Sequence, residues 1–214
     1  MFISFEGIEG AGKSTAMALL AEALRLRGHD VVETREPGGC SLGRLLRPIL
    51  LDARTDGLSS RAELFLFLAD RAQHVHSQIR PALEAGNIVL CDRFTDSTIV
   101  YQGAGRGLDP DALRRINLLA TGGLTPDLTF LLDLPVALGL ERAGIRNRRE
   151  GTVISEGRFD SESLNFHERI RQGYLALAAE EPQRIAIIDA QQPADDILLQ
   201  CLSATEEALR GRAE

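Results

Sequence analysis

The sequence predicts an α/β fold, in which a five-stranded parallel sheet is covered by helices on both faces. Three observations lead to this prediction: short apolar runs alternate with longer helical patterns, the runs are nearly continuous in apolar residues, and polar clusters follow the first three runs. Continuous apolar runs are typical of strands buried on both faces, and their alternation with helices is typical of parallel sheets. Neither a linker nor a repeat interrupts the 214 residues, so we expect a single domain over residues 1–214.

Each of the expected strands is a short run rich in Ile, Val, Leu or Phe. In chain order the strands are Phe2–Phe5, Val31–Thr34, Ile88–Cys91, Leu128–Leu132 and Arg184–Ile188. The patterns between and after them repeat apolar residues at the spacing of an amphipathic helix. These helices span Ser14–Arg27, Ser41–Leu51, Ser60–Glu84, Asp109–Thr121, Pro135–Arg146, Ser161–Glu180 and Pro193–Arg210. In such folds ligands bind beyond the carboxyl ends of the strands, which is where the polar clusters lie.

The long helix expected over Ser60–Glu84 carries more apolar residues than one core-facing stripe needs. We expect Phe65 in the core, and we expect the surplus apolar surface to face a second subunit in a homodimer. His74 and His76 are two residues apart, so they point in different directions on a helix. We interpret both as residues of the helix surface or of the dimer face.

The segment from Gly7 to Ser14 reads Gly-Ile-Glu-Gly-Ala-Gly-Lys-Ser and joins the first expected strand to the first expected helix. Glycines allow positive φ angles and let consecutive amides face an anion, which the N-terminus of the next helix also attracts. Lys13 is the only lysine of the chain, and a compact ammonium suits a position between two phosphates. The Ser14 hydroxyl would join the coordination of Mg²⁺. The motif therefore predicts a nucleoside triphosphate site, and the alternative is a glycine-rich turn without a ligand.

Composition and charge exclude several classes of protein. A net charge of −7 argues against a protein that coats nucleic acid, because affinity for a polyanion depends on surplus cations. Cys40, Cys91 and Cys201 are far apart and odd in number, which argues against a disulfide framework or a zinc site and favours a reducing compartment. No apolar run approaches the ~20 residues that span a bilayer. We expect a cytoplasmic protein with neither a nucleic-acid partner nor a membrane partner.

Charged residues follow the second and third expected strands. Asp92 closes the run Ile88–Cys91, where a carboxylate would hold Mg²⁺ directly or through water; the alternatives are a helix N-cap or an ion pair with Arg93. Arg93 is placed to bind a second phosphate, which its planar guanidinium suits. Arg35 would face the same cavity, and the alternative is a surface ion pair with Glu36.

Arginines and glycines crowd the segment between Arg142 and Arg158. Flexible backbone with several cations is typical of a lid that closes on phosphates and expels water, and we expect this lid at about 143–158. The glycine-rich loop contains no arginine, so the positive charge for a transferring phosphoryl group would come from Arg146, Arg148 or Arg149. A solvated charged loop is the alternative.

Four segments together resemble the thymidylate kinase family of P-loop nucleoside-monophosphate kinases. They are the loop Glu6–Thr15, the sequence Thr34-Arg35-Glu36-Pro37-Gly38-Gly39, the sequence Asp92-Arg93-Phe94 followed by Tyr101-Gln102-Gly103, and the lid region into Phe159. The similarity in order and spacing extends over nearly the whole chain. It implies a P-loop NTPase-type fold and transfer of the γ-phosphoryl group of MgATP to dTMP, giving ADP and dTDP in the dTTP pathway.

The resemblance also implies residue roles at the ATP site. The loop residues that bind ATP would be Gly7, Ile8, Glu9, Gly10, Ala11, Gly12, Lys13, Ser14 and Thr15. Arg142 would lie over adenine, and Ala190, in the turn after the last strand, would help close the other side of that pocket. Mg²⁺ would be held by Ser14 and Asp92.

For the sugar and phosphate of dTMP, the resemblance implies four contacts. Glu9 would bind the 3′-hydroxyl, and Tyr101 would press on the deoxyribose. Arg35 and Arg93 would hold the phosphate, with Pro37 beside it. The Glu36–Pro37 bond resembles the cis peptide of this family.

For thymine, the resemblance implies that Phe67 stacks on the ring and that Arg71, one helical turn later, donates to O4. Ser97 or Thr98, together with Gln102, would contact the base near N3. Arg71 disfavours the nearest rival, a kinase for another monophosphate, because a guanidinium donates to a carbonyl and not to the amino group of cytosine.

Two features depart from the family pattern: Cys40 stands where threonine is expected, and the lid aligns poorly, which leaves the choice among its arginines open. A nucleotide-dependent switch is the rival from another class. A guanine-reading GTPase would normally show an Asn-Lys-x-Asp stretch, which a chain with one lysine, at Lys13, does not contain. A protein that only stores nucleotide would not need the second, arginine-lined site.

Overall fold

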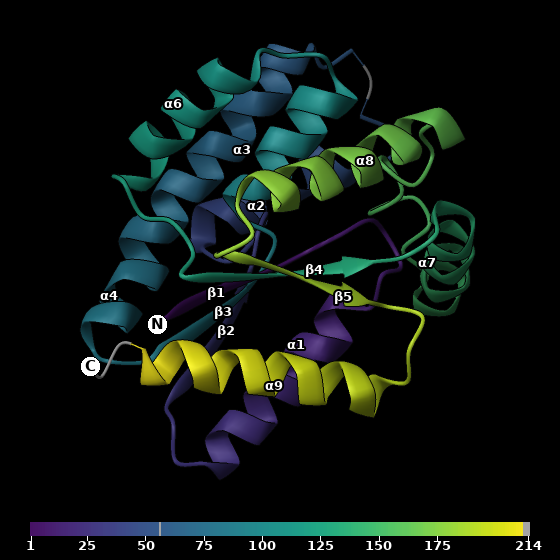
Figure 1. Ribbon diagram of the computed structural model, residues 1–214. Helices are drawn as coiled ribbons and strands as arrows, with labels where there is room; N and C mark the ends of the chain where they lie inside the picture. The colour runs from purple at the N-terminus through teal and green to yellow at the C-terminus, as the bar shows by residue number, and fades with distance from the viewer. Residues whose placement is uncertain (56, 212–214) are drawn as a thin grey trace.

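The computed structural model describes residues 1–55 and 57–211, which form a parallel sheet with helices on both of its faces (Figure 1). The strands lie in the order β2-β3-β1-β4-β5, and every neighbouring pair is parallel. Their bounds are β1 Phe2–Glu6, β2 Val31–Arg35, β3 Ile88–Asp92, β4 Leu128–Asp133 and β5 Ile185–Asp189. The fold predicted from the sequence is confirmed.

Figure 1 shows how helices cover the two faces of the sheet. One face carries α1 (Lys13–Leu26) and α9 (Ala194–Arg210), which pack against each other. The other face carries α3 (Ser60–His74), α4 (Arg80–Glu84), α6 (Pro110–Thr121) and α8 (Leu164–Glu180). The remaining α-helices are α2 (Ser41–Leu51), α5 (Thr95–Thr98) and α7 (Val136–Glu150).

All five strands end one residue beyond the run that predicts them, at Glu6, Arg35, Asp92, Asp133 and Asp189. The backbone register explains this extension, because Phe5 and Arg35 both lie opposite Asp92 in the parallel ladders. The ladder depends on backbone groups, so a polar side chain does not end it. Charged side chains consequently gather at the carboxyl edge of the sheet.

The core lies on both sides of the central strand. Successive side chains of a strand point to opposite faces. Ile3 and Phe5 therefore join a cluster with Leu20 of α1, while Phe2 packs with Val75 on the other face. This packing fixes β1 between the helical layers, and β1 in turn positions the loop that follows it.

The helix expected over Ser60–Glu84 is interrupted by a π-helical turn, η1 (Val75–Ile79), between α3 and α4. Pro81 lies at the start of α4 and has no amide hydrogen to donate. Its ring would also clash with the carbonyl four residues earlier in a regular α-helix. The wider turn just before Pro81 relieves this conflict.

A helical segment that we did not expect lies between β3 and α6. It consists of α5 followed by the π-helical turn η2 (Ile99–Gly105). Its polar residues and two glycines are typical of a loop, but tertiary packing overrides that preference. A Cβ atom at Gly105 would lie 2.8 Å from the Phe166 ring, so α8 packs directly on this backbone.

Two expectations for the long helix are wrong. Phe65 is 63% exposed, because the core-facing stripe of α3 is occupied by its neighbours Leu64 and Leu68. His74 is fully buried, with Nε2 2.6 Å from Thr34 Oγ1 and Nδ1 2.9 Å from Glu36 Oε1. Its polar partners come from β2 and the loop after it, which helical periodicity cannot show. His76 is exposed, as expected.

No helix within the described ranges combines the length and the apolar character that crossing a membrane requires.

Candidate active site

The glycine-rich loop connects β1 to α1 and turns sharply toward α7. Gly7, Gly10 and Gly12 have φ angles of 135°, 73° and 90°. At Gly10 the space is as restrictive as the angle, since a Cβ atom would lie 2.0 Å from the Gly139 carbonyl oxygen. Only glycine fits this close approach of two backbones. The loop is therefore fixed in shape, and α1 begins directly after it at Lys13.

Lys13 is 8% exposed, and its ammonium donates to the carbonyl oxygens of Gly7 and Ile8 at 3.0 and 2.8 Å. Burial and the nearby charge of Arg93 lower the pKa of Lys13 to about 8. A phosphate beside this ammonium would oppose both effects and favour its charged form. Lys13 is thus held at the loop in a position that suits an anion.

Ser14, at the start of α1, and Asp92, at the end of β3, lie in hydrogen-bond contact at the carboxyl edge of the sheet. The Ser14 hydroxyl donates to Asp92 Oδ2 at 2.7 Å, although the two residues are 78 positions apart in the chain. A hydroxyl and a carboxylate are hard oxygen donors, which Mg²⁺ prefers, and Mg²⁺ commonly takes one or two protein ligands together with phosphates and water. The donor set therefore fits the expected magnesium site.

Arg93 adopts an unusual backbone conformation directly after β3. Its φ angle is 72°, and it is the only non-glycine residue with a positive φ in the part of the chain that the structure describes. Such a conformation is costly and persists only where the surroundings enforce it. Here the guanidinium donates to Glu9 Oε1 at 3.0 Å and to the hydroxyls of Ser97 and Tyr174 at 3.2 Å, and it lies 4.8 Å from the centre of the Tyr101 ring.

Glu9 links the glycine-rich loop to this arginine. Its Oε1 accepts hydrogen bonds from Arg93 and from the Tyr101 hydroxyl, and its Oε2 lies 3.3 Å from His167 Nδ1. Burial alone would raise the pKa of Glu9, but the His167 contact and the charges of Arg93 and Lys13 outweigh it and hold the pKa well below its usual range. Glu9 is therefore an ionised acceptor that faces both sides of the site.

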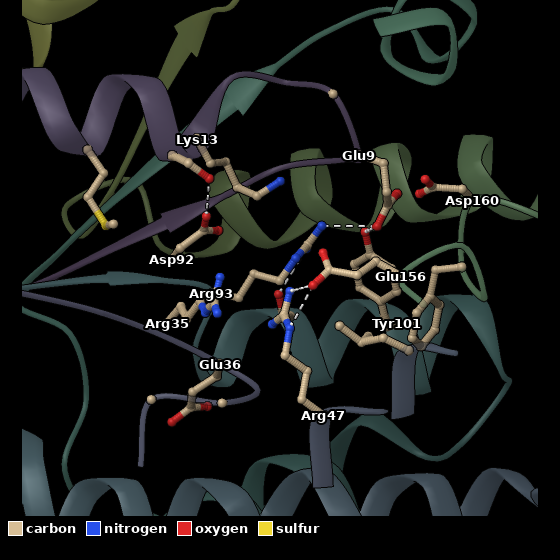
Figure 2. A pocket seen from close by; sticks show the side chains of 18 of the residues that line it. Glu9, Lys13, Arg35, Glu36, Arg47, Asp92, Arg93, Tyr101, Glu156 and Asp160 are labelled. Atoms are coloured by element: carbon tan, nitrogen blue, oxygen red, sulfur yellow. Dashed lines mark hydrogen bonds and ion pairs between the residues drawn. The ribbon is translucent and has the colours of Figure 1, made fainter. Parts of the chain in front are cut away.

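These side chains line one cavity of about 880 Å³ (Figure 2). It brings together most of the site residues that the sequence and the resemblance suggest. Those that line it are Glu9, Gly10, Gly12, Lys13, Ser14, Thr15, Arg35, Phe67, Arg71, Asp92, Arg93, Ser97, Thr98, Tyr101, Gln102, Arg142, Arg146 and Arg149. The glycine-rich loop, Arg93 and two arginines of the candidate lid thus line the same cavity.

The candidate adenine-binding residues form a smaller hollow of about 150 Å³ next to this cavity. Ala11, Arg142 and Ala190 line it, and Arg142 Nη1 donates to the Ala190 carbonyl oxygen at 3.2 Å. Gly12, Thr15 and Arg142 line both spaces. The hollow therefore continues from the loop toward the turn after β5.

The loop after β2 contains the expected cis peptide bond between Glu36 and Pro37. Arg35 is exposed and lines the cavity. The alternative of a surface ion pair between Arg35 and Glu36 is wrong, because the Glu36 side chain is 2% exposed and bonds Arg71 at 2.8 Å and His74 at 2.9 Å. Pro37 is buried outside the cavity lining, and its carbonyl accepts from Arg47.

Arg71 is almost fully buried at the wall of the cavity. It donates to Glu36, Thr98, Asn117 and the Phe94 carbonyl at 2.7–2.9 Å. A guanidinium has five N–H groups, and these bonds use four of them. One Nη2 hydrogen remains for an acceptor in the cavity. The four buried hydrogen bonds hold the guanidinium in place.

Under this loop lies a buried acid that sequence reasoning missed. Asp70 Oδ1 contacts Gly38 N at 3.4 Å and Cys40 Sγ at 3.9 Å, and no hydrogen-bond donor among the described residues reaches Oδ2. Burial and the charge of Glu36 raise the pKa of Asp70 to about 6. Cys40 also accepts from Gly43 N at 3.3 Å at the start of α2. The departure from threonine at position 40 thus leaves this carboxylate with a weak thiol donor.

The arginines of the expected lid differ in where they lie. α7 extends into this region and ends at Glu150, where Gly151 adopts a φ of 70°. Arg146 and Arg149 line the cavity, whereas Arg148 packs near Gly144 outside its lining. Arg146 donates twice to Asn147 Oδ1, at 3.1 and 2.9 Å, while Arg149 is 79% exposed.

Glu6 and Glu63 are further buried acids that the sequence did not reveal. Glu6 ends β1 and accepts from Phe94 N at 2.8 Å, from Ser97 Oγ at 2.6 Å and from Tyr174 Oη at 2.7 Å. Burial and the charge of Asp96 raise its pKa to about 7. The available signal was a charged residue directly after an apolar run. Glu6 thus holds Phe94 and Ser97, which follow Arg93 in the chain.

The chain is similar over nearly its whole length to known proteins of one family. The thymidylate kinase family model matches residues 5–200. The chain is 71% identical to the thymidylate kinase of Desulfovibrio desulfuricans over 212 residues, which cover 99% of this chain and 98% of the relative. It is 58% identical to that of Solidesulfovibrio magneticus, over 92% and 94% of the two chains. A crystal structure of thymidylate kinase from Ehrlichia chaffeensis superimposes with a TM-score of 0.75 at 35% identity, covering 96% of this chain and 98% of that one.

Proposed function

The chain belongs to the thymidylate kinase family, an enzyme family that transfers the γ-phosphoryl group of ATP to dTMP, and we propose that the cavity of about 880 Å³ holds both substrates. The protein is thus a kinase of nucleotide biosynthesis that yields ADP and dTDP. The observation that carries the placement is that Lys13 of the glycine-rich loop and Arg93 after β3 line the same cavity.

In this proposal ATP lies along the glycine-rich loop. Amide groups of the loop and the N-terminus of α1 bind its phosphates, and Lys13 lies between the β- and γ-phosphates. The adenine ring occupies the smaller hollow beside Arg142 and Ala190, which opens from the loop at Gly12 and Thr15. Arg142 is tethered to the Ala190 carbonyl, so it is positioned to lie over a ring.

The phosphate of dTMP lies against Arg93, with Arg35 on its other side. Arg93 supplies a planar fork that suits a phosphate monoester. Glu9 accepts from the 3′-hydroxyl of the sugar, and Tyr101, which is held by Glu9, packs on the deoxyribose. Both contacts sit between the two phosphate sites, so the sugar fixes the acceptor phosphate relative to ATP.

Thymine occupies the part of the cavity lined by Phe67, Arg71, Thr98 and Gln102. Phe67 is half-buried, which leaves ring surface for stacking. Arg71 has one N–H group available for O4. Ser97 is tied to Glu6 and Tyr174, so we assign it to positioning Arg93 rather than to the base.

We further propose that Mg²⁺ binds to the Ser14 hydroxyl and the Asp92 carboxylate, whose hydrogen bond at 2.7 Å brings both oxygens together. Held there, the ion would supply positive charge beside the phosphates of ATP. The protein residues do the rest: Lys13 and the loop amides orient ATP, and Arg93 orients the acceptor oxygen in line. That acceptor is already a phosphate oxygen, so the site needs no strong general base.

Closure of residues 143–158 would bring a lid arginine to the transferring phosphoryl group and exclude water. Arg149 is the strongest candidate, because it lines the cavity and is 79% exposed, with one ion pair to Glu150 at 3.5 Å. Arg146 also lines the cavity and acts with it. Arg148 lies outside the lining, and we propose no contact with substrate for it.

We propose that the protein is a homodimer in the cytoplasm and that residues 1–214 act as one kinase domain. Phe65 of α3 is 63% exposed, Leu45 of α2 is 72% exposed and Leu119 of α6 is 83% exposed. α3 packs against both α2 and α6, so these side chains lie on adjoining helices. Surface this apolar is typical of a protein interface. The three cysteines are buried free thiols, which fits a reducing compartment.

The proposal is tested by measuring ADP release from MgATP in a coupled assay, with dTMP, dUMP, dCMP, dGMP and AMP offered separately. Turnover that strongly favours dTMP is expected from the base contacts of Phe67 and Arg71. Preference for another monophosphate would leave the phosphate sites in place and overturn the assignment of the base pocket.

A further inference from the structure

Glu63 lies on α3, and its carboxylate is a buried junction between three segments of the chain. The residue is 1% exposed. Its Oε1 accepts from Gln102 Nε2 of η2 at 3.0 Å, and its Oε2 accepts from Arg158 Nη2 at 2.6 Å. Arg106 donates to both oxygens at 3.3 Å. One acid thus holds a residue of the thymine pocket and two arginines.

Two arginines, Arg106 and Arg158, donate to this buried carboxylate. A buried carboxylate is stable in its charged form only where cations and hydrogen-bond donors compensate it, and Arg106 and Arg158 provide both. Glu63 balances the positive charge of one arginine, and Glu162, which pairs with Arg106, balances the charge of the other. An ionised carboxylate only accepts hydrogen bonds. The Gln102 side chain must therefore present its NH₂ group to Glu63.

This requirement settles which end of the Gln102 amide is left for the cavity. Nε2 is bound to Glu63, so Oε1 lies on the opposite side of the amide. No donor among the described residues bonds Oε1, and Gln102, although 2% exposed, lines the cavity together with Phe67 and Arg71. Gln102 consequently presents its amide oxygen, a hydrogen-bond acceptor, to the base, and not its NH₂ group.

We propose that Glu63 is a positioning residue for base specificity: it fixes the Gln102 amide so that Oε1 accepts the N3–H group of thymine. This inference rests on the proposed placement of thymine beside Gln102. Cytosine has an unprotonated N3, so a fixed amide oxygen there faces another acceptor and leaves both groups without a donor. Glu63 thus disfavours binding of cytosine through the orientation of Gln102, although it does not contact the base.

The test compares kcat/KM for dTMP with that for 5-methyl-dCMP, which carries the same methyl group and differs only in the groups at N3 and C4. In Glu63→Gln the partner of Gln102 can donate as well as accept, so the amide is free to turn. We expect the dTMP to 5-methyl-dCMP ratio to fall by about 10-fold, the effect of one hydrogen bond, with the KM for ATP unchanged.

Arg106→Gln is the matched control, because Arg158 Nη2 still bonds the Glu63 carboxylate at 2.6 Å and Glu63 stays in place as the partner of Gln102. Its ratio is expected to stay within about 2-fold of the wild-type value even if its thermal midpoint falls. Should Glu63→Gln fail to fold, the charge-balanced double variant Glu63→Gln with Arg106→Gln replaces it, since Arg158 and Glu162 then remain as equal and opposite charges.

Gln102→Ala separates failure of this inference from failure of the pocket assignment. A lower ratio in Gln102→Ala with an unchanged ratio in the Glu63 variants would overturn the role of Glu63 alone. An equal fall of the ratio in Arg106→Gln would also overturn it. General destabilisation of the buried cluster would then explain the loss of specificity. An unchanged ratio in Gln102→Ala would show that the base does not lie beside Gln102. That result would contradict both the placement of thymine and the inference that depends on it.

Discussion

Arg93 Nη2 lies 3.0 Å from Glu9 Oε1, so a cation after β3 is ion-paired with an acid inside the glycine-rich loop after β1 (Figure 2). The two side chains are 19% and 11% exposed, which makes this a largely desolvated contact. It joins the proposed acceptor site to the proposed donor site. Neither phosphate-binding element can shift without affecting the other.

Replacing Glu9 tests this link. Glu9→Gln removes the negative charge that holds Arg93 and the ionised acceptor for the 3′-hydroxyl. We expect the KM for dTMP to rise by about 10-fold or more, as for loss of a hydrogen bond to a charged group, with a smaller change in the KM for ATP. Tyr101→Phe removes only the hydroxyl bonded to Glu9 and is expected to have a weaker effect. Steady-state kinetics that leave the KM for dTMP unchanged in Glu9→Gln would contradict the assignment.

The lid arginines are tested by three alanine variants. Arg149→Ala is expected to lower kcat by a factor on the order of 10² or more, because it removes positive charge from the transferring phosphoryl group. Arg146→Ala is expected to lower it less, and Arg148→Ala least, since Arg148 lies outside the cavity lining. Single-turnover rates measure the chemical step directly. A larger loss in Arg148→Ala than in Arg149→Ala would reverse the assignment.

The stability of the protein is expected to depend on Asp70 under weakly acid conditions. Burial and the charge of Glu36 raise its pKa from the ordinary 3.8 to about 6. Between these values the folded state binds more protons than the unfolded state, so the free energy of unfolding falls as the pH rises. This contribution is fully present below about pH 4 and is lost above about pH 6.

Thermal midpoints of the wild type and Asp70→Asn, measured from pH 4 to pH 7, isolate this effect. The midpoint of the wild type is expected to fall by about 4 °C relative to the variant across that range, a shift that corresponds to roughly 1–2 kcal/mol in a chain of this size. Two parallel curves would show that Asp70 does not titrate as its surroundings imply.

The proposed dimer is tested at Phe65. Phe65→Glu places a charge in the exposed apolar surface of α2, α3 and α6, and it is expected to convert the protein from twice the 23.3 kDa chain mass to the chain mass itself in light scattering at micromolar concentration. Leu199→Glu is the control, since Leu199 is equally exposed, at 63%, on α9. A monomeric wild type, or equal effects of the two variants, would contradict the interface.

The sequence predicted the sheet, the order of its elements and the glycine-rich loop because these depend on local patterns. Strand runs are apolar for burial on both faces, and Lys13 and Ser14 stand at fixed positions in a loop whose shape glycine determines. Even there, strand ends were placed one residue early, since the pairing of Asp92 with Phe5 and Arg35 is a property of the backbone.

What the sequence could not predict depends on partners distant in the chain. His74 is polar and lies on a helix, yet it is buried because Thr34 and Glu36 reach it from β2 and the following loop. The helix over Thr95–Gly105 forms because α8 packs on its glycine, against local preference. Glu63 likewise reads as a surface residue of a helix until Arg158 and Gln102 are seen beside it.

The central claim is that one cavity contains two separate phosphate sites, and calorimetric titration of two variants tests it most directly. Titrations with dTMP and with a non-hydrolysable ATP analogue would be made on the wild type, Lys13→Ala and Arg93→Ala. We expect Lys13→Ala to abolish turnover and to lose affinity for the analogue while retaining dTMP binding, and we expect Arg93→Ala to show the reverse pattern, each by about 10-fold or more. Unchanged dTMP affinity in Arg93→Ala, or equal losses of both ligands in either variant, would contradict the account.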